Sequence, residues 1–243
     1  MRCVSYFCLA IIAVAVVLAG VQSVVIYRST KRMSYDSRPF VRQNPKARLR
    51  LLFMGDSTAV GTGAESNTES VAGYFGQAFP EAQIDNDSYN GRKLDQLVGQ
   101  FPSVEGSVYD LVVVQIGAND IMQLTPLNKI ARDITRVISE AKRIGRHVVI
   151  LHSGNVGLAP VFIWPFDWIM TERSGAVRRI YMKKAQEAGV MYVDLFTERS
   201  NDLFLKDIPK YYSPDHLHPS GEGYRWWYER IRATLQRSGV VLQ

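Results

Sequence analysis

The chain has 243 residues, of which 47% are hydrophobic, and this is enough for one domain with a substantial core plus an extension. The formal net charge is +6, but the charge is unevenly distributed. Residues 1–50 contain nine Lys or Arg and one acid, whereas residues 51–243 contain twenty Lys or Arg and twenty-two acids. The folded part is therefore nearly neutral, which argues against a basic nucleic-acid-binding face.

An apolar segment runs from Val4 to about Tyr27. About 20 apolar residues cross a bilayer as a helix, whereas the apolar part of a signal peptide needs only about 7–15. The length favours an uncleaved, single-pass N-terminal transmembrane helix over residues 1–27; the alternative is a cleaved signal peptide of a secreted or periplasmic protein. The basic residues that follow would keep the domain cytoplasmic by the positive-inside rule, whereas an ordinary signal anchor exports it. The side of the membrane stays open, and we expect export.

Residues 28–48 are basic and include Pro39 and Pro45, which predicts a linker ahead of a domain over residues 49–240. The only two cysteines, Cys3 and Cys8, lie in the apolar segment. Disulfides and cysteine-based metal sites are therefore excluded from the domain.

Within the domain, apolar runs alternate with helical patterns. Continuous apolar runs predict buried strands at Leu49–Met54, Asp110–Gly117, His147–His152 and Val190–Phe196, with a weaker edge strand at Gln83–Asp87. Helical patterns fall near Val71–Phe79, Lys93–Phe101, Leu127–Ile144, Thr171–Ala188 and Gly221–Arg237. This alternation predicts a mostly parallel five-stranded sheet covered by helices on both faces, with ligands bound at the carboxyl ends of the strands.

Gly55-Asp56-Ser57 directly follows the first of these strands. A serine in this place is often only a helix cap, with the preceding residues forming the turn. The phosphate-loop patterns fail on spacing, and the nucleophile elbow G-x-S-x-G fails because position 59 is Ala. Near the end of the chain, Asp215 precedes His218 by three residues. Such a pair can supply the base and the orienting carboxylate that a serine nucleophile needs.

Two more motifs fall at expected strand ends. Asn90-Gly91 follows the weak second strand and favours a tight turn, although a glycine N–H can also approach a substrate oxygen closely. Gly117-Ala118-Asn119-Asp120 ends the strongest strand. Its Asn119 either caps the next segment or directs its amide into the crevice.

Taken in their order along the chain, Gly55-Asp56-Ser57, Gly91, Gly117-Ala118-Asn119-Asp120 and Asp215-His216-Leu217-His218-Pro219 resemble the four blocks of the SGNH (GDSL) hydrolase family in order and spacing, over roughly Leu51 to Trp227. The resemblance implies a flavodoxin-like, three-layer α/β/α sandwich and hydrolysis of carboxylic esters without a cofactor or a metal. It implies that Ser57 is the nucleophile, His218 the base and Asp215 the residue that orients it. The backbone N–H groups of Ser57 and Gly91 and the side chain of Asn119 would form the oxyanion hole.

His216 departs from the family pattern, which usually has Gly at this position. It places a second histidine near the serine, and the spacing from Asp215 favours His218 as the base. We keep His216 as a candidate substrate contact.

An aromatic stretch after the fourth strand contains Phe162, Trp164, Phe166 and Trp168 and is too irregular for an amphipathic helix. It is either a loop packed on the core or an apolar wall for an acyl chain, which could also touch the bilayer. Phe162, Trp164 and Phe166 are therefore candidate substrate contacts, and this interpretation favours lipidic or acylated substrates over free sugars.

We expect a serine esterase that cleaves acyl or acetyl esters, among them lipid-like, lysophospholipid or thioester substrates. An O-acyltransferase or acetyltransferase would use the same acyl-enzyme, and a binding module that has lost the chemistry is a third possibility. The expected partners are a small-molecule, lipid or glycan ester and the membrane, without nucleic acid. The sequence leaves the natural ester and the oligomeric state open.

Overall fold

The computed structural model describes residues 2–101 and 109–242 of the chain. The strands are β1 (Arg50–Gly55), β2 (Gln83–Ser88), β3 (Tyr109–Gln115), β4 (Gly145–Leu151) and β5 (Met191–Tyr192). The helices are α1 (Arg2–Asp36), α2 (Ser57–Val60), α3 (Val71–Ala78), α4 (Leu94–Leu97), α5 (Ala118–Met122), α6 (Leu127–Ile144), α7 (Phe166–Ala188), α8 (Leu203–Lys206), α9 (Ile208–Tyr211) and α10 (Gly221–Arg237). Three short 3₁₀ turns are η1 (Asn67–Glu69), η2 (Val156–Leu158) and η3 (Arg199–Asn201).

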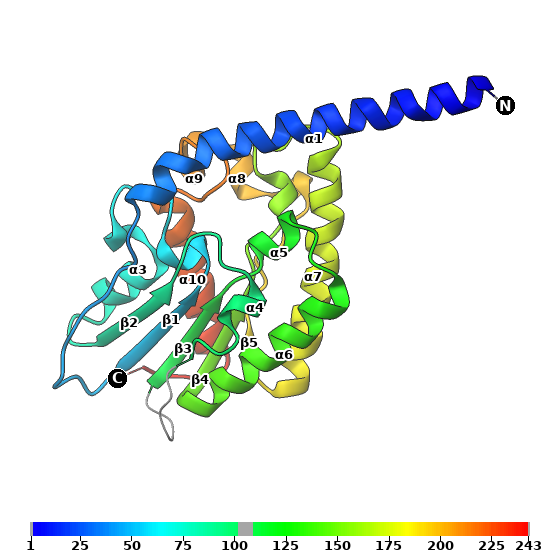
Figure 1. The fold of residues 1–243 in the computed structure, drawn as a ribbon. Coiled ribbons are helices and arrows are strands. Elements are labelled where there is room, and N and C mark those ends of the chain that lie inside the picture. Colours follow the sequence, from blue (N-terminus) through cyan, green and yellow to red (C-terminus); the bar gives the residue numbers. More distant parts are fainter. Residues whose placement is uncertain (1, 102–108, 243) are drawn as a thin grey trace.

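The five strands form one sheet in the order β2-β1-β3-β4-β5, and every neighbouring pair is parallel. β2 lies on one side of β1, and β3, β4 and β5 follow on its other side. The direction in which successive strands are added therefore reverses between β1 and β3. Open α/β sheets bind ligands outside the carboxyl ends of the strands at such a reversal. β1 and β3 lie side by side (Figure 1). Ser57 follows β1 and Asn119 follows β3, so both residues lie at this point of the sheet.

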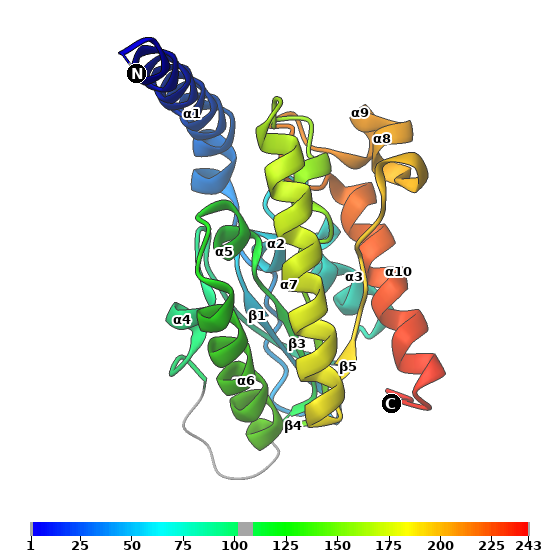
Figure 2. The same cartoon turned by 90° about the vertical axis from the view of Figure 1, so that its right-hand side faces the viewer.

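Helices cover both faces of the sheet, which gives the three layers that the resemblance implied (Figure 2). Side chains alternate between the faces along each strand. Leu52 and Met54 of β1 enter the core cluster under α6 and α7, whereas Leu51 and Phe53 enter the cluster under α3 and α10. β1 is therefore buried on both sides, as its continuous apolar run predicts.

Helix α1 extends away from the domain at its N-terminal end and packs on it nearer its C-terminal end (Figure 1). Gln22 joins the helix to the loop before α7, donating to the carbonyl of Val161 at 2.9 Å and accepting from the N–H of Ile163 at 3.1 Å. The expected anchor falls partly outside the described residues, because residue 1 and many side chains of residues 2–16 are not described. For the part of the chain that is described, no helix has both the length and the apolar character needed to cross a bilayer.

Residues 28–36, expected as linker, continue α1, and the chain after them packs along the edge of the sheet. Arg42 exchanges two backbone hydrogen bonds with Ile84 of β2, both at 2.9 Å. Its guanidinium also donates to the carbonyls of Gly76, Phe79 and Pro80 at 2.8–3.0 Å, at the C-terminal end of α3.

Three expected elements differ in extent. The Val190–Phe196 run pairs only over Met191–Tyr192, and the Lys93–Phe101 helix shortens to Leu94–Leu97. The helix expected from Thr171 begins at Phe166. The other expected strands and helices of the domain lie within two residues of their expected bounds, and α2, α5, α8 and α9 are additional short helices.

Candidate active site

The turn after β1 places Ser57 at the start of the short helix α2. Gly55 admits no side chain, because a Cβ there would lie 1.8 Å from the carbonyl oxygen of Gln115. Asp56 caps α2 by accepting hydrogen bonds from the backbone N–H of Thr58 at 2.9 Å and from its hydroxyl at 2.7 Å. The tight turn therefore presents Ser57 at the carboxyl edge of the sheet.

Ser57, His218 and Asp215 form a continuous hydrogen-bonded chain. Nε2 of His218 lies 2.9 Å from Oγ of Ser57, and Nδ1 lies 2.6 Å from Oδ2 of Asp215. All three side chains are buried. A carboxylate partner on Nδ1 leaves Nε2 as the acceptor, which is the tautomer that can take the serine proton. The structure thus brings together the three residues expected to form the triad.

The second oxygen of Asp215 is held by three donors. Oδ1 accepts from the hydroxyl of Ser213 at 2.6 Å and from the N–H groups of Leu217 and His218, both at 2.9 Å. Burial acts to raise the pKa of Asp215, but the bonds to His218 and Ser213 outweigh it and lower this pKa to about 2. Asp215 is therefore ionised over the whole range in which an esterase works. Ser213 is a site residue that the sequence analysis did not identify.

The three expected oxyanion donors lie on three different turns. Asn119 is buried on α5 and donates one amide hydrogen to the carbonyl of Arg92 at 3.0 Å, so its second N–H remains for a ligand. Gly91 has φ of +80°, a conformation that favours glycine, and no other atom lies within 4 Å of the place where a Cβ would be. Its N–H and that of Ser57 donate to no other described residue.

Asp56 connects two of these turns. Besides capping α2, its Oδ2 accepts from the backbone N–H of Gly117 at 3.2 Å, so one carboxyl links the nucleophile turn to the Asn119 turn. It is fully buried, and burial raises its pKa above the usual value despite these hydrogen bonds.

His216 does not reach Ser57. It is exposed and lines a separate surface hollow beside Pro214 and Lys210. Its φ of +58° is left-handed, the conformation that favours glycine and that non-glycine residues adopt infrequently. This geometry explains why glycine is usual at this position of the family, and it separates His216 from the catalytic hydrogen bonds.

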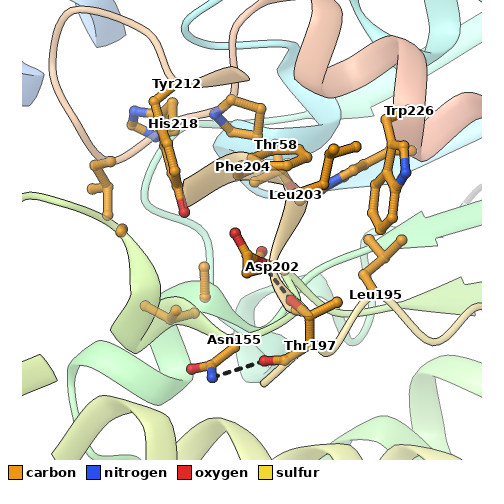
Figure 3. A pocket seen from close by; sticks show the side chains of 18 of the residues that line it. Thr58, Asn155, Leu195, Thr197, Asp202, Leu203, Phe204, Tyr212, His218 and Trp226 are labelled. Carbon is orange, nitrogen blue, oxygen red and sulfur yellow. Dashed lines mark hydrogen bonds between the residues drawn. The ribbon is translucent and has the colours of Figure 1, made fainter. Parts of the chain in front are cut away.

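A cavity of about 260 Å³ opens beside Ser57 and His218. Figure 3 shows Tyr212, Phe204 and Trp226 along one side of it. The cavity is not lined by Phe162, Trp164 or Phe166, the residues expected as substrate contacts. Phe162 is buried in the core, Phe166 packs against that core, and Trp164 is 77% exposed. Phe162 and Phe166 therefore follow the alternative expectation of a segment packed on the core, and a role of the three residues as substrate contacts stays a prediction.

His152 and His147 were not expected in the site. His152 is buried and packs edge-on against Tyr181 with ring centroids 5.4 Å apart. Both of its ring nitrogens lack a hydrogen-bond partner among the described residues, and burial lowers its pKa to about 4. Among the residues described, no group of three or more His, Cys, Asp or Glu side chains is placed to hold a metal ion.

A three-layer α/β/α sandwich with a Ser-His-Asp chain at the carboxyl ends of its strands is a hydrolase architecture. The profile of the GDSL-like lipase/acylhydrolase family matches residues 53–226. The chain therefore belongs to this family and is an SGNH (GDSL) hydrolase. None of the curated protein sequences matches it.

Solved structures with low sequence identity share the fold. Phospholipase A1 from Streptomyces albidoflavus NA297 is 14% identical with a TM-score of 0.62, over 77% of this chain and 100% of that one. An extracellular lipase from Streptomyces rimosus is 16% identical with a TM-score of 0.60, over 76% and 99%. The acetylxylan esterase Axe2 from Geobacillus stearothermophilus is 19% identical with a TM-score of 0.52, over 79% and 96%.

Proposed function

We propose that the protein is a serine esterase that hydrolyses acyl or acetyl esters through an acyl-enzyme on Ser57. The observation that supports this most strongly is the hydrogen-bonded chain from Ser57 through His218 to Asp215, at 2.9 and 2.6 Å. Neutral serine is a weak nucleophile, and an adjacent, oriented base is what activates it.

In the first half of the reaction, Oγ of Ser57 attacks the acyl carbon while Nε2 of His218 takes the hydroxyl proton. The N–H groups of Ser57 and Gly91 and the amide of Asn119 stabilise the oxyanion. Collapse of the tetrahedral intermediate breaks the bond to the alcohol, which leaves with the proton from His218. Asp215 stabilises the imidazolium throughout.

In the second half, water attacks the acyl-enzyme and gives a proton to His218. The acid is released, and the proton returns to Oγ of Ser57. If a sugar or lipid hydroxyl takes the place of water, the same acyl-enzyme transfers its acyl group instead.

The proposal is tested by hydrolysis of a p-nitrophenyl ester series and by fluorophosphonate labelling of the full chain. We expect the wild-type protein to be labelled on Ser57 and to hydrolyse the esters, and Ser57→Ala to lose at least about 10³-fold in kcat. A folded protein that is not labelled, or equal rates in the two proteins, would refute the assignment of the nucleophile.

Product analysis with and without an alcohol acceptor separates the hydrolase from the transferase. Free acid as the main product in the presence of the acceptor supports the esterase. An acylated acceptor as the main product supports the transferase.

The membrane location stays a prediction from the apolar segment at residues 4–27. Fractionation of cells that express the full chain tests it. Recovery of Ser57 labelling in the membrane pellet after carbonate washing is the expected result.

A further inference from the structure

Gln22 is a polar residue within the apolar segment of α1, and its side chain is only 4% exposed. Its amide nitrogen donates to the carbonyl of Val161 at 2.9 Å, and its amide oxygen accepts from the N–H of Ile163 at 3.1 Å. Both groups of the amide are therefore used, on partners 139 and 141 positions away in the sequence. A buried amide costs free energy unless it is hydrogen-bonded, so these two bonds fix Gln22 on the backbone of residues 161–163.

The backbone of Val161 reaches the loop that carries the catalytic histidine. Its N–H donates to the carbonyl of His216 at 3.0 Å. The N–H of the same peptide group, which belongs to Leu217, donates to Oδ1 of Asp215 at 2.9 Å. Because a peptide group is planar and rigid, a bond that holds its carbonyl also fixes the direction of its N–H. Val161 therefore helps to orient the carboxyl group of Asp215.

From Asp215 the hydrogen bonds continue to His218 at 2.6 Å and from there to Ser57 at 2.9 Å. A continuous series of hydrogen bonds thus leads from α1 to the nucleophile. Its middle part needs support, because the left-handed backbone of His216, with φ of +58°, persists only where the surroundings hold it. The bond from Val161 supplies such support.

Two further contacts fix the position of α1 on the domain. Ile26, one turn after Gln22, packs against the core cluster under α6 and α7. Ser37, directly after α1, places its Oγ 2.9 Å from Oγ1 of Thr62, whose N–H donates to the carbonyl of Ser57 at 3.0 Å. α1 is therefore a fixed support from which Gln22 can hold a loop in place.

We propose that Gln22 is a positioning residue of the reaction. It holds residues 161–163 and, through the peptide group between His216 and Leu217, keeps Asp215 and His218 in the geometry that activates Ser57. This inference rests on the esterase function proposed for Ser57. Gln22 is not among the described residues that line the cavity, so its effect falls on the alignment of the base and not on the binding of substrate.

The first test is Gln22→Met in the full chain, because methionine keeps the length and the helical preference of glutamine but removes both hydrogen bonds. We expect kcat for p-nitrophenyl acetate to fall about tenfold, with KM within about twofold of the wild type. The rate constant for fluorophosphonate labelling of Ser57 should fall by the same factor. A folded variant whose kcat and labelling rate both stay within twofold of the wild type would overturn the proposal.

Gln83→Met is the matched control. Gln83 is also a buried glutamine that joins distant parts of the chain, since its side chain accepts from the N–H of Asn44 at 2.7 Å and donates to Asp85 at 2.9 Å. It pairs in register with Arg50 at the start of β1 and so lies at the opposite end of the sheet from Ser57. We expect this variant to keep kcat within twofold. An equal loss of kcat in the two variants would show a general structural effect and reject the positioning role.

Hydrogen exchange measured by mass spectrometry tests the same series of bonds without turnover. We expect the amides of residues 213–218 to exchange at least about tenfold faster in Gln22→Met than in the wild type, and at the wild-type rate in Gln83→Met. Unchanged protection of this loop in Gln22→Met would contradict the proposal.

Gln22→Asn is a milder variant that guards against a failure of Gln22→Met to fold. Its amide is one methylene shorter and cannot reach both Val161 and Ile163. We expect kcat about threefold below the wild type. A wild-type kcat in Gln22→Asn would count against the proposal whatever the fate of Gln22→Met.

Labelling of the wild-type protein separates this inference from the proposed function. A labelled Ser57 whose rate does not depend on Gln22 rejects the positioning role and leaves the esterase function standing. An unlabelled Ser57 in a folded wild-type sample rejects both.

Discussion

Asn119 uses one of its two amide hydrogens to hold the carbonyl of Arg92, at 3.0 Å. The bond fixes the side chain before a substrate arrives, so the second N–H needs no reorganisation to meet the oxyanion. Preorganised donors of this kind are usually the largest single contribution to stabilising the transition state.

We therefore expect Asn119→Ala to lower kcat about 10²- to 10³-fold. The lost bond to Arg92 costs about 1 kcal/mol of unfolding free energy, so the variant stays folded. Ester kinetics and thermal unfolding measure the two effects. Asn128→Ala on the exposed side of α6 is the control, and a loss of less than threefold in Asn119→Ala would remove Asn119 from the oxyanion hole.

His216 gives a contrasting prediction, because its φ of +58° favours glycine. We expect His216→Gly to keep kcat/KM within about twofold and to keep the stability within about 1 kcal/mol, since relief of strain offsets the greater freedom of the unfolded chain. His216→Val should destabilise by about 1–3 kcal/mol, because a β-branched residue tolerates this conformation poorly. A large loss of activity in the glycine variant would show that the imidazole takes part in the reaction.

His152 makes the stability depend on pH. Burial lowers its pKa to about 4, so the unfolded chain binds a proton between pH 6.5 and 4 that the folded chain does not. The stabilisation is complete above pH 6.5 and is lost as the pH falls towards 4, by roughly 3 kcal/mol.

Urea unfolding at pH 7 and pH 4.5, compared between the wild type and His152→Leu, measures this effect. Asp56 and Asp120 have pKa values raised by burial and act in the opposite direction, so the difference between the two proteins is the informative quantity. We expect the variant to lose less stability than the wild type on acidification. Parallel losses would exclude His152 as the cause.

At the scale of elements, the segment before β1 covers the edge of the sheet. The paired backbone of Arg42 occupies part of the open edge of β2, and its guanidinium caps α3. Exposed strand edges favour association between chains, and covering them is a common protection.

We expect Arg42→Met to lower the unfolding free energy by about 2 kcal/mol, because three charge-assisted hydrogen bonds to carbonyls are lost. Chemical denaturation measures this loss, and light scattering at moderate temperature measures the accompanying association. Arg48→Met, at an exposed position of the same segment, is the control and should behave like the wild type.

The strands and long helices could be predicted from the sequence because burial on both faces gives continuous apolar runs, and amphipathic helices have a clear period. The early end of β5, at Tyr192, could not be predicted from the sequence. Asp194 interrupts the run, and its carboxylate accepts hydrogen bonds from the guanidinium of Arg178 at 2.5–3.0 Å and from the N–H of Phe196 at 3.2 Å. The ion pair with Arg178 and the local bond to Phe196 take the chain out of the sheet.

The sequence carries a signal for the start of α7. Pro165 directly precedes the helix, and proline is common at the first positions of helices. The irregular run of aromatic residues predicted a loop there instead, and the expected substrate wall depended on that loop.

At the scale of the whole molecule, the catalytic residues could be predicted because each follows a strand or lies in the last loop. Their placement follows from the topology of a parallel sheet. Ser153 and Asn155 line the cavity and also follow a strand, β4, so they could have been included on the same ground.

The rest of the cavity could not be predicted in this way. Phe204, Tyr212 and Trp226 come from short helices and from one side of α10, and only the packing of the complete chain brings them to Ser57. Their positions depend on contacts between distant segments, which no local pattern in the sequence records.

The nucleophile turn packs directly on the histidine loop. Gly63 lies so close that a Cβ there would be 2.4 Å from the carbonyl oxygen of Pro219 and 2.8 Å from Cβ of His218. Ser57 forms its hydrogen bond with His218, a base that is synthesised 161 residues later. During synthesis the serine is therefore an ordinary alcohol, and it becomes a nucleophile only when the last loop closes on the first turn. Chemical reactivity of this one side chain is thus a direct signal that the polypeptide has finished folding.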